Sequence, residues 1–115
     1  MKHADSAVNL SGKTSLHQLA YLMTRMKLFI SNDSGPLHLA AAMKTPTIFF
    51  YGPETPNLYG PWGESNTVFY KHLECSPCIN IYNAKRIDCR RGAECVKRIT
   101  VEEVTAKIAS SGVLK

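Results

Sequence analysis

Residues 31–42 read Ser31-Asn32-Asp33-Ser34-Gly35-Pro36-Leu37-His38-Leu39-Ala40-Ala41-Ala42, and this stretch decides the fold. It lies between apolar runs at 28–30 and 47–51, which are short, unpatterned and rich in β-forming residues, as in strands that are buried on both faces. Pro36 suits the first turn of a helix, because its missing N–H would be unpaired there, and the sequence predicts this helix over 37–43. The order strand, short loop, helix, strand predicts an α/β fold with parallel strands.

The loop at the start of this helix has the chemistry of an anion site. Backbone N–H groups are free at a helix N-terminus and the helix dipole is positive there, so the loop can hold a phosphate. Asp33, Ser34 and His38 bring side chains that bind hydroxyls or anions to the same point, and Gly35 lets a ligand approach the backbone. A plain helix cap beside a surface histidine is the alternative interpretation.

The flanking segments extend the α/β pattern. Ser15 and Gln18 form a capping-box pattern at the start of a helix. We expect strands at 7–10 and 67–70, and the loops 31–36 and 52–66 both follow strands, so they lie at the carboxyl edge of the sheet, where such folds bind ligands. The apolar stripe that we expect to bury the first helix consists of Leu16, Leu19, Ala20, Met23 and Met26.

The last helix has its own boundary signals. Thr100 and Glu103 form a second capping-box pattern, and Gly112 can end the helix in a left-handed conformation.

A cysteine-rich segment, residues 72–95, has no clear helix or strand pattern. Four thiolates could bind zinc tetrahedrally and order a loop that has little core of its own. Disulfides, which are rare in the cytosol, and reduced cysteines that pack as small apolar side chains are the open alternatives. The four residues are Cys75, Cys78, Cys89 and Cys95.

The charge balance restricts the partners. The net charge is +5 and hydrophobic residues make up 44% of the chain, which excludes a disordered chain. Basic residues concentrate in the segment 85–98, which favours a phosphate-bearing ligand, an anionic membrane surface or simply a solvated face. No nucleic-acid-binding motif is present, and neither a signal peptide nor a membrane span is found, so we expect a cytoplasmic location, with peripheral association at the inner face of the membrane.

Several motifs in series resemble those of one enzyme family. Residues 32–42, Thr45-Pro46 and the run 51–56 (Tyr-Gly-Pro-Glu-Thr-Pro) resemble the signature of the heptosyltransferases, glycosyltransferase family 9. The segment 10–16 and Cys75-Ser76-Pro77-Cys78 are similar to that family as well. The resemblance runs in the family's order from about Leu10 to Ile108, and an ordered series is more specific than any single motif.

The resemblance implies a partial Rossmann-like domain, the C-terminal half of a GT-B glycosyltransferase, with the N-terminal acceptor domain absent. Residues 1–115 would then form one partial domain with the cysteine-rich segment inside it. The implied reaction transfers a sugar, heptose, from a nucleoside diphosphate sugar such as ADP-heptose to the lipopolysaccharide core. The lipid-linked saccharide acceptor would bind through the missing domain.

The same resemblance implies roles for residues. Donor binding falls to Asp33, Ser34, Gly35 and His38, with Lys13 as a contributor from a neighbouring loop. The resemblance assigns no catalytic residue in this chain and requires no metal cofactor. The full-length parent would be an enzyme, and this chain alone would be inactive because it lacks the catalytic residues. A non-catalytic nucleotide-sugar-binding module and a zinc-stabilised interaction domain are the alternatives, and self-association through exposed apolar surface is a further expectation.

Overall fold

A computed structural model describes residues 6–83 and 88–113, and a parallel sheet lies at its centre. The strands are β1 (Phe29–Asn32), β2 (Thr47–Phe50) and β3 (Asn66–Phe69), in the order β1-β2-β3. Phe29 pairs with Thr47, and Thr47 in turn pairs with Asn66. The α/β fold with parallel strands is therefore confirmed.

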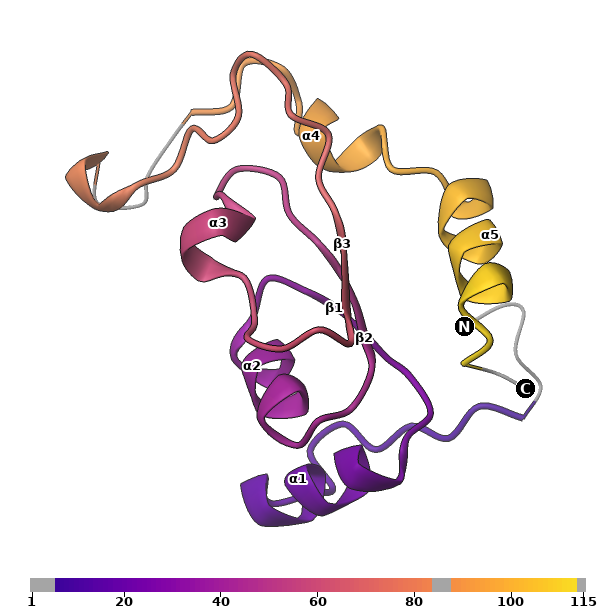
Figure 1. The fold of residues 1–115 in the computed structure, drawn as a ribbon. Coiled ribbons are helices and arrows are strands. Elements are labelled where there is room, and N and C mark those ends of the chain that lie inside the picture. Colours follow the sequence, from indigo (N-terminus) through magenta and orange to yellow (C-terminus); the bar gives the residue numbers. More distant parts are fainter. Residues whose placement is uncertain (1–5, 84–87, 114–115) are drawn as a thin grey trace.

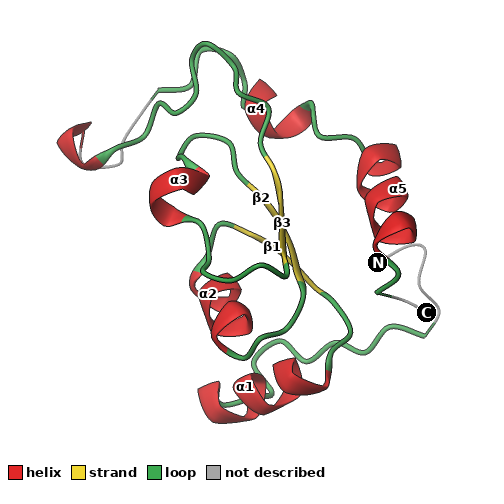
Figure 2. Ribbon diagram, viewed as in Figure 1, coloured by secondary structure: helices red, strands yellow, loops and turns green. Residues whose placement is uncertain are grey.

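Helices of different lengths connect and flank the strands (Figures 1 and 2). The helix α2 contacts β1 and β2, and α1 packs against α2, whereas α5 lies on the other side of the strands in the view of Figure 1. The helical elements are α1 (Leu16–Arg25), α2 (Gly35–Ala42), α3 (Pro56–Tyr59), the 3₁₀ turn η1 (Ile81–Asn83), α4 (Glu94–Lys97) and α5 (Val101–Ser111). None of the helices in the described part of the chain has the length and apolar character that a bilayer span requires.

The capping signals set the helix boundaries. At α1, Ser15 Oγ accepts from the Gln18 N–H and the Gln18 side chain accepts from the Ser15 N–H, so the predicted capping box is present. At α5 only the Thr100 half forms, because the Glu103 carboxylate instead pairs with Lys71 Nζ at 2.7 Å. Gly112 ends α5 with a φ of +69°, as expected of a C-terminal glycine.

The core lies between the sheet and α2. Leu37 is completely buried against Phe49 of β2 and against Tyr51, which directly follows β2, and Tyr59 and Tyr70 pack around this cluster. The Phe49 and Tyr51 rings meet edge to face with centroids 5.4 Å apart. Leu37 lies in the first turn of α2, directly after the loop that joins β1 to α2, so this core fixes that loop on the sheet.

A buried hydroxyl joins α1 to the sheet. Thr45 Oγ1 donates to the Met23 carbonyl at 2.7 Å, and Thr45 and Met23 are both buried. The Met23 carbonyl also accepts from the Met26 N–H at 3.1 Å, so the Thr45 hydroxyl is its second donor and ties the end of α1 to the turn before β2.

Three expectations were wrong. Residues 7–10 form no strand and Val8 is 79% exposed, because no strand among the described residues pairs with them. Leu16 is 69% exposed and does not join the buried stripe of α1. Ile30 is 48% exposed, because β1 is an edge strand of this sheet, so only β2 is buried on both faces as predicted.

The cysteine-rich segment leaves the sheet after β3, reaches η1 and returns to α4 (Figure 1). Most of it is loop, with the short η1 and α4 as its regular parts (Figure 2). Lys85 and Arg86 of the basic segment lie outside the described residues.

Candidate functional site

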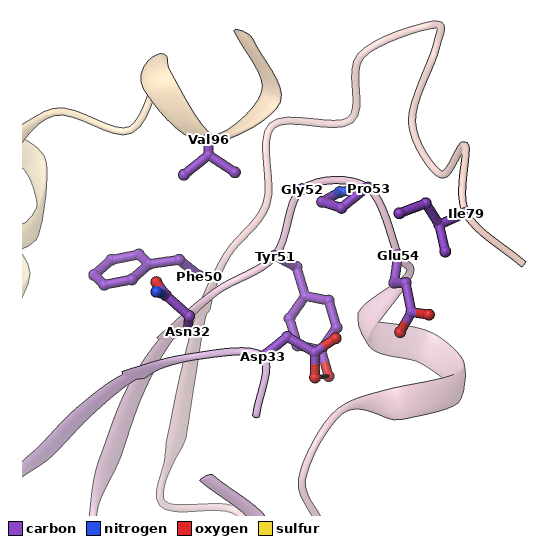
Figure 3. A pocket seen from close by; sticks show the side chains of 9 residues that line it. All are labelled: Asn32, Asp33, Phe50, Tyr51, Gly52, Pro53, Glu54, Ile79 and Val96. Carbon is purple, nitrogen blue, oxygen red and sulfur yellow. Dashed lines mark hydrogen bonds between the residues drawn. The ribbon is translucent and has the colours of Figure 1, made fainter. Parts of the chain in front are cut away.

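A cleft of about 460 Å³ opens where β1 and β2 end (Figure 3). Its floor comes from the residues that end or directly follow the two strands. Its upper walls come from Ile79 of the cysteine-rich segment and from Val96, which directly follows that segment. A cleft at the carboxyl edge of a parallel sheet is where α/β folds bind their ligands. The residues that end or directly follow these strands and line the cleft are Asn32, Asp33, Phe50, Tyr51, Gly52, Pro53 and Glu54.

Tyr51 holds Asp33 in place. The Tyr51 hydroxyl donates to Asp33 Oδ1 at 3.0 Å and also forms a hydrogen bond with the Tyr59 carbonyl. The tyrosine ring is 1% exposed, so its oxygen has a fixed position. The Tyr51 hydroxyl has one proton and two acceptors, so it forms a shared hydrogen bond. This shared bond links the loop after β1 to the end of α3.

Burial is the main cause that raises the pKa of Asp33 above the ordinary value of an aspartate. The Tyr51 hydroxyl lowers this pKa, the nearby Glu54 carboxyl raises it, and the charge of His38 lowers it again. Glu54 is itself buried, and Figure 3 shows its carboxyl directed to the same side of the cleft as that of Asp33. Negative charge on Glu54 therefore disfavours the charged form of Asp33.

We expect Glu54→Gln to lower the pKa of Asp33, because the substitution removes the negative charge beside it. Carbon-detected NMR titration of the Asp33 carboxyl measures this pKa directly. Glu64→Gln, which changes a carboxyl outside the cleft, is the matched control and should leave the titration unchanged. An unchanged Asp33 pKa in Glu54→Gln would contradict the coupling.

The same raised pKa predicts a pH dependence of stability. Folded Asp33 keeps its proton to higher pH than unfolded Asp33, so the folded state binds more protons in the window just above the ordinary aspartate pKa. The free energy of unfolding should therefore fall as pH rises through that window, and Asp33→Asn should lose this contribution.

The N-terminus of α2 lies beside the cleft. Ser34 is its N-cap residue, but its hydroxyl bonds to the Asn32 carbonyl and to Ser31 Oγ instead of capping the helix. The space in front of Gly35 is open, since a Cβ built there would meet no atom within 4 Å. The first turn of α2 thus has no side-chain cap from Ser34 and open space in front of it.

The structure brings some of the predicted residues together and separates one. Asp33 lines the cleft, and His38 lies exposed on the first turn of α2, near enough to affect the Asp33 pKa. Lys13 instead lines a different hollow, together with His17 and Tyr21 of α1.

Of the nine residues that line this cleft, sequence reasoning selected Asp33 as a binding residue and left the other eight unselected. Tyr51 and Glu54 follow a predicted strand at the carboxyl edge, so their position gave a signal. Ile79 and Val96 gave none, because they come from a segment without a recognisable pattern.

The four cysteines are free thiols in this structure. Cys95 is buried, Cys78 is half-buried, and Cys75 and Cys89 are exposed. Burial raises the pKa of the Cys78 thiol, and the neighbouring thiols of Cys95, Cys75 and Cys89 raise it further. Among the described residues, no three His, Cys, Asp or Glu side chains are grouped as a ready metal site.

The parallel sheet, the short loop into α2 and the cleft at the strand ends define part of a Rossmann-like α/β domain. The profile of glycosyltransferase family 9 (heptosyltransferase) matches residues 1–86. The chain belongs to this family.

Individual relatives agree with the family assignment. Lipooligosaccharide heptosyltransferase 2 of Campylobacter jejuni (strain 81116) is 30% identical over 101 residues, which cover 87% of this chain and 30% of that protein. A crystal structure of a family 9 glycosyltransferase from Veillonella parvula matches with a TM-score of 0.64 at 30% identity, over 90% of this chain and 28% of the other. The structure of E. coli heptosyltransferase WaaC with ADP matches with a TM-score of 0.59 at 27% identity, over 84% of this chain and 24% of the other. The chain therefore spans about a quarter of the length of its relatives.

Proposed function

We propose that this chain carries the donor-binding part of a heptosyltransferase and binds the diphosphate of a nucleoside diphosphate sugar at the N-terminus of α2. The observation that carries the proposal is the open first turn of α2 next to a cleft at the carboxyl edge of the sheet. WaaC, the E. coli relative, has been solved with ADP, which is the nucleotide part of such a donor.

The roles follow from charge. The N–H groups of Ser34 and Gly35 donate to phosphate oxygens, because Pro36 has no N–H and the Leu37 N–H already donates to the Ser34 carbonyl at 3.1 Å. The positive end of the helix dipole stabilises the negative charge that develops when the sugar leaves. His38 donates a further hydrogen bond to phosphate. Asp33 repels phosphate when it is ionised, so its contact is with a sugar hydroxyl in the cleft. No metal ion is needed if the helix end and basic side chains together neutralise the diphosphate charge.

Lys13 lies away from the cleft. It lines a hollow on α1 and not the cleft, so its contribution would be through the general positive field near the donor and not through a phosphate contact in this arrangement.

The test is an amide NMR titration of this chain with ADP, UDP and GDP. We expect shifts concentrated in residues 32–39, because the loop and the first turn of α2 would contact the diphosphate. In His38→Ala the affinity should fall at least about tenfold, since a hydrogen bond to a charged group contributes about 1.5–3 kcal/mol.

His17→Ala is the matched control, because His17 is also an exposed helical histidine but lies on α1 beside the other hollow. It should bind nucleotide as the unchanged chain does. Equal weakening by both substitutions would contradict the assigned role of His38. A folded sample that binds none of the three nucleotides would contradict donor binding by this chain.

A further inference from the structure

The four cysteines lie on two stretches of the cysteine-rich segment that meet at Gly52-Pro53. The N–H groups of Cys78 and Ile79 both donate to the Pro53 carbonyl, at 2.8 and 2.9 Å, which fixes the first stretch on the turn after β2. Ser76 Oγ also bonds to the Gly52 carbonyl. Cys78 is therefore anchored by its own backbone at one side of this turn.

Cys95 is anchored on the same turn from the second stretch. A Cβ placed on Gly52 would lie 2.9 Å from Cys95 Sγ and 2.5 Å from Val96 Cγ2, so Cys95 and Val96 pack where Gly52 has no side chain. Each stretch thus contributes one anchored cysteine, Cys78 or Cys95, and one exposed cysteine, Cys75 or Cys89.

The turn between Cys89 and Cys95 is shaped for a thiolate. The Ala93 N–H donates to Cys89 Sγ at 3.3 Å, a backbone N–H···S bond of the kind that orients and stabilises a coordinating thiolate. Gly92 and Ala93 both adopt the left-handed conformation, with φ of +57° and +63°, which folds the backbone around this sulfur. A left-handed alanine is unfavourable, so the turn is held by its surroundings.

The charges around the cysteines are complementary to a metal–thiolate centre. Four thiolates and one divalent cation carry a net charge of −2. Basic residues lie within three positions after each cysteine of the second stretch. Arg90 and Arg91 come after Cys89, and Lys97 and Arg98 come shortly after Cys95. Arg98 already pairs with Glu94 at 3.0 Å, whereas Arg90 and Arg91 are exposed.

We propose that Cys75, Cys78, Cys89 and Cys95 bind one zinc ion and thereby clamp the two stretches of the cysteine-rich segment over the cleft. Among the described residues the four sulfurs are not yet grouped as a metal site, so binding requires Cys75, and the turn that holds Cys89 Sγ on the Ala93 N–H, to move toward the anchored pair. Zinc binding releases thiol protons and orders the segment, since coordination needs deprotonated ligands.

The clamp would act on the walls of the cleft. Ile79 directly follows Cys78, and Val96 directly follows Cys95. These two residues form the part of the cleft lining that does not come from the strand ends. Figure 3 shows them on either side of the Gly52-Pro53 turn. A zinc ion that joins Cys78 to Cys95 would therefore fix the position of both walls.

The test measures zinc in the whole purified chain by elemental analysis. We expect one zinc per chain, and cobalt substitution should give the intense visible d–d bands of a tetrahedral thiolate site. Cys75→Ser and Cys89→Ser change exposed positions, so each variant should keep its fold by circular dichroism. Each should weaken zinc binding more than about 100-fold in competition with a chelator. Loss of a residue that only supports a metal ligand already costs about 10–100-fold in affinity, and loss of a ligand should cost more. Removal of zinc should shift the amide signals of Ile79 and Val96 and leave those of α1 unchanged.

His72→Ala is the control, because His72 is an exposed imidazole at the start of the same segment and its ring packs on Tyr70. It should retain zinc. Three outcomes would overturn the proposal: a folded chain without stoichiometric zinc or a cobalt spectrum, an intact mass that shows disulfides, or zinc that survives both serine substitutions. None of these readouts depends on nucleotide binding.

Discussion

Leu37→Ala is expected to lower the free energy of unfolding by about 2–5 kcal/mol. Leu37 is completely buried, and its side chain packs against the rings of Phe49 and Tyr51. Truncation would leave a cavity that these rings cannot fill without moving. Since a domain of this size has a total stability of about 5–15 kcal/mol, a substantial part of it would be lost. Urea unfolding followed by circular dichroism measures the change.

Leu58→Ala is the matched control for this substitution. Leu58 is 77% exposed on α3, so the same truncation should change the free energy of unfolding by less than about 0.5 kcal/mol. If both substitutions had the same small effect, the core described here would not be what holds the loop on the sheet.

Tyr51→Phe is expected to cost about 1–3 kcal/mol of unfolding free energy and to raise the pKa of Asp33 further. The substitution keeps the ring and removes a buried hydroxyl that binds Asp33 and the Tyr59 carbonyl. The Tyr59 carbonyl and Asp33 both lose this donor, and Asp33 loses the bond that lowers its pKa. Urea unfolding and NMR titration of the Asp33 carboxyl provide the two measurements.

Tyr82→Phe serves as control, because Tyr82 is 93% exposed and loses its hydroxyl at the surface. It should change neither quantity. An Asp33 pKa that falls in Tyr51→Phe would show that Tyr51 does not stabilise the charged carboxylate.

Local signals in the sequence predicted most of the fold. The capping box at Ser15, the proline in the first turn of α2 and the glycine that ends α5 each act within a few residues, so they can be recognised without a structure. The strand at 7–10 was mispredicted because a strand depends on a partner, and its own residues do not reveal whether that partner exists. The same reason explains the exposure of Ile30 on the edge strand β1.

The candidate site was only partly predictable. Asp33, Ser34, Gly35 and His38 are contiguous with the helix start, so one motif reveals them together. Tyr51 reaches Asp33 across 18 residues of sequence, and the pairing depends on the register between β1 and β2. The contribution of Ile79 and Val96 depends on the path of an irregular segment, for which local sequence carries no rule.

The order of the strands also bears on how the chain folds. Each strand of the sheet pairs with the strand that comes next in the sequence, through one short helical connection or loop. Closing such short loops costs little chain entropy, and every added strand finds the edge of its predecessor already formed. The sheet can therefore assemble by successive addition from β1 to β3, in the same direction as the chain is synthesised.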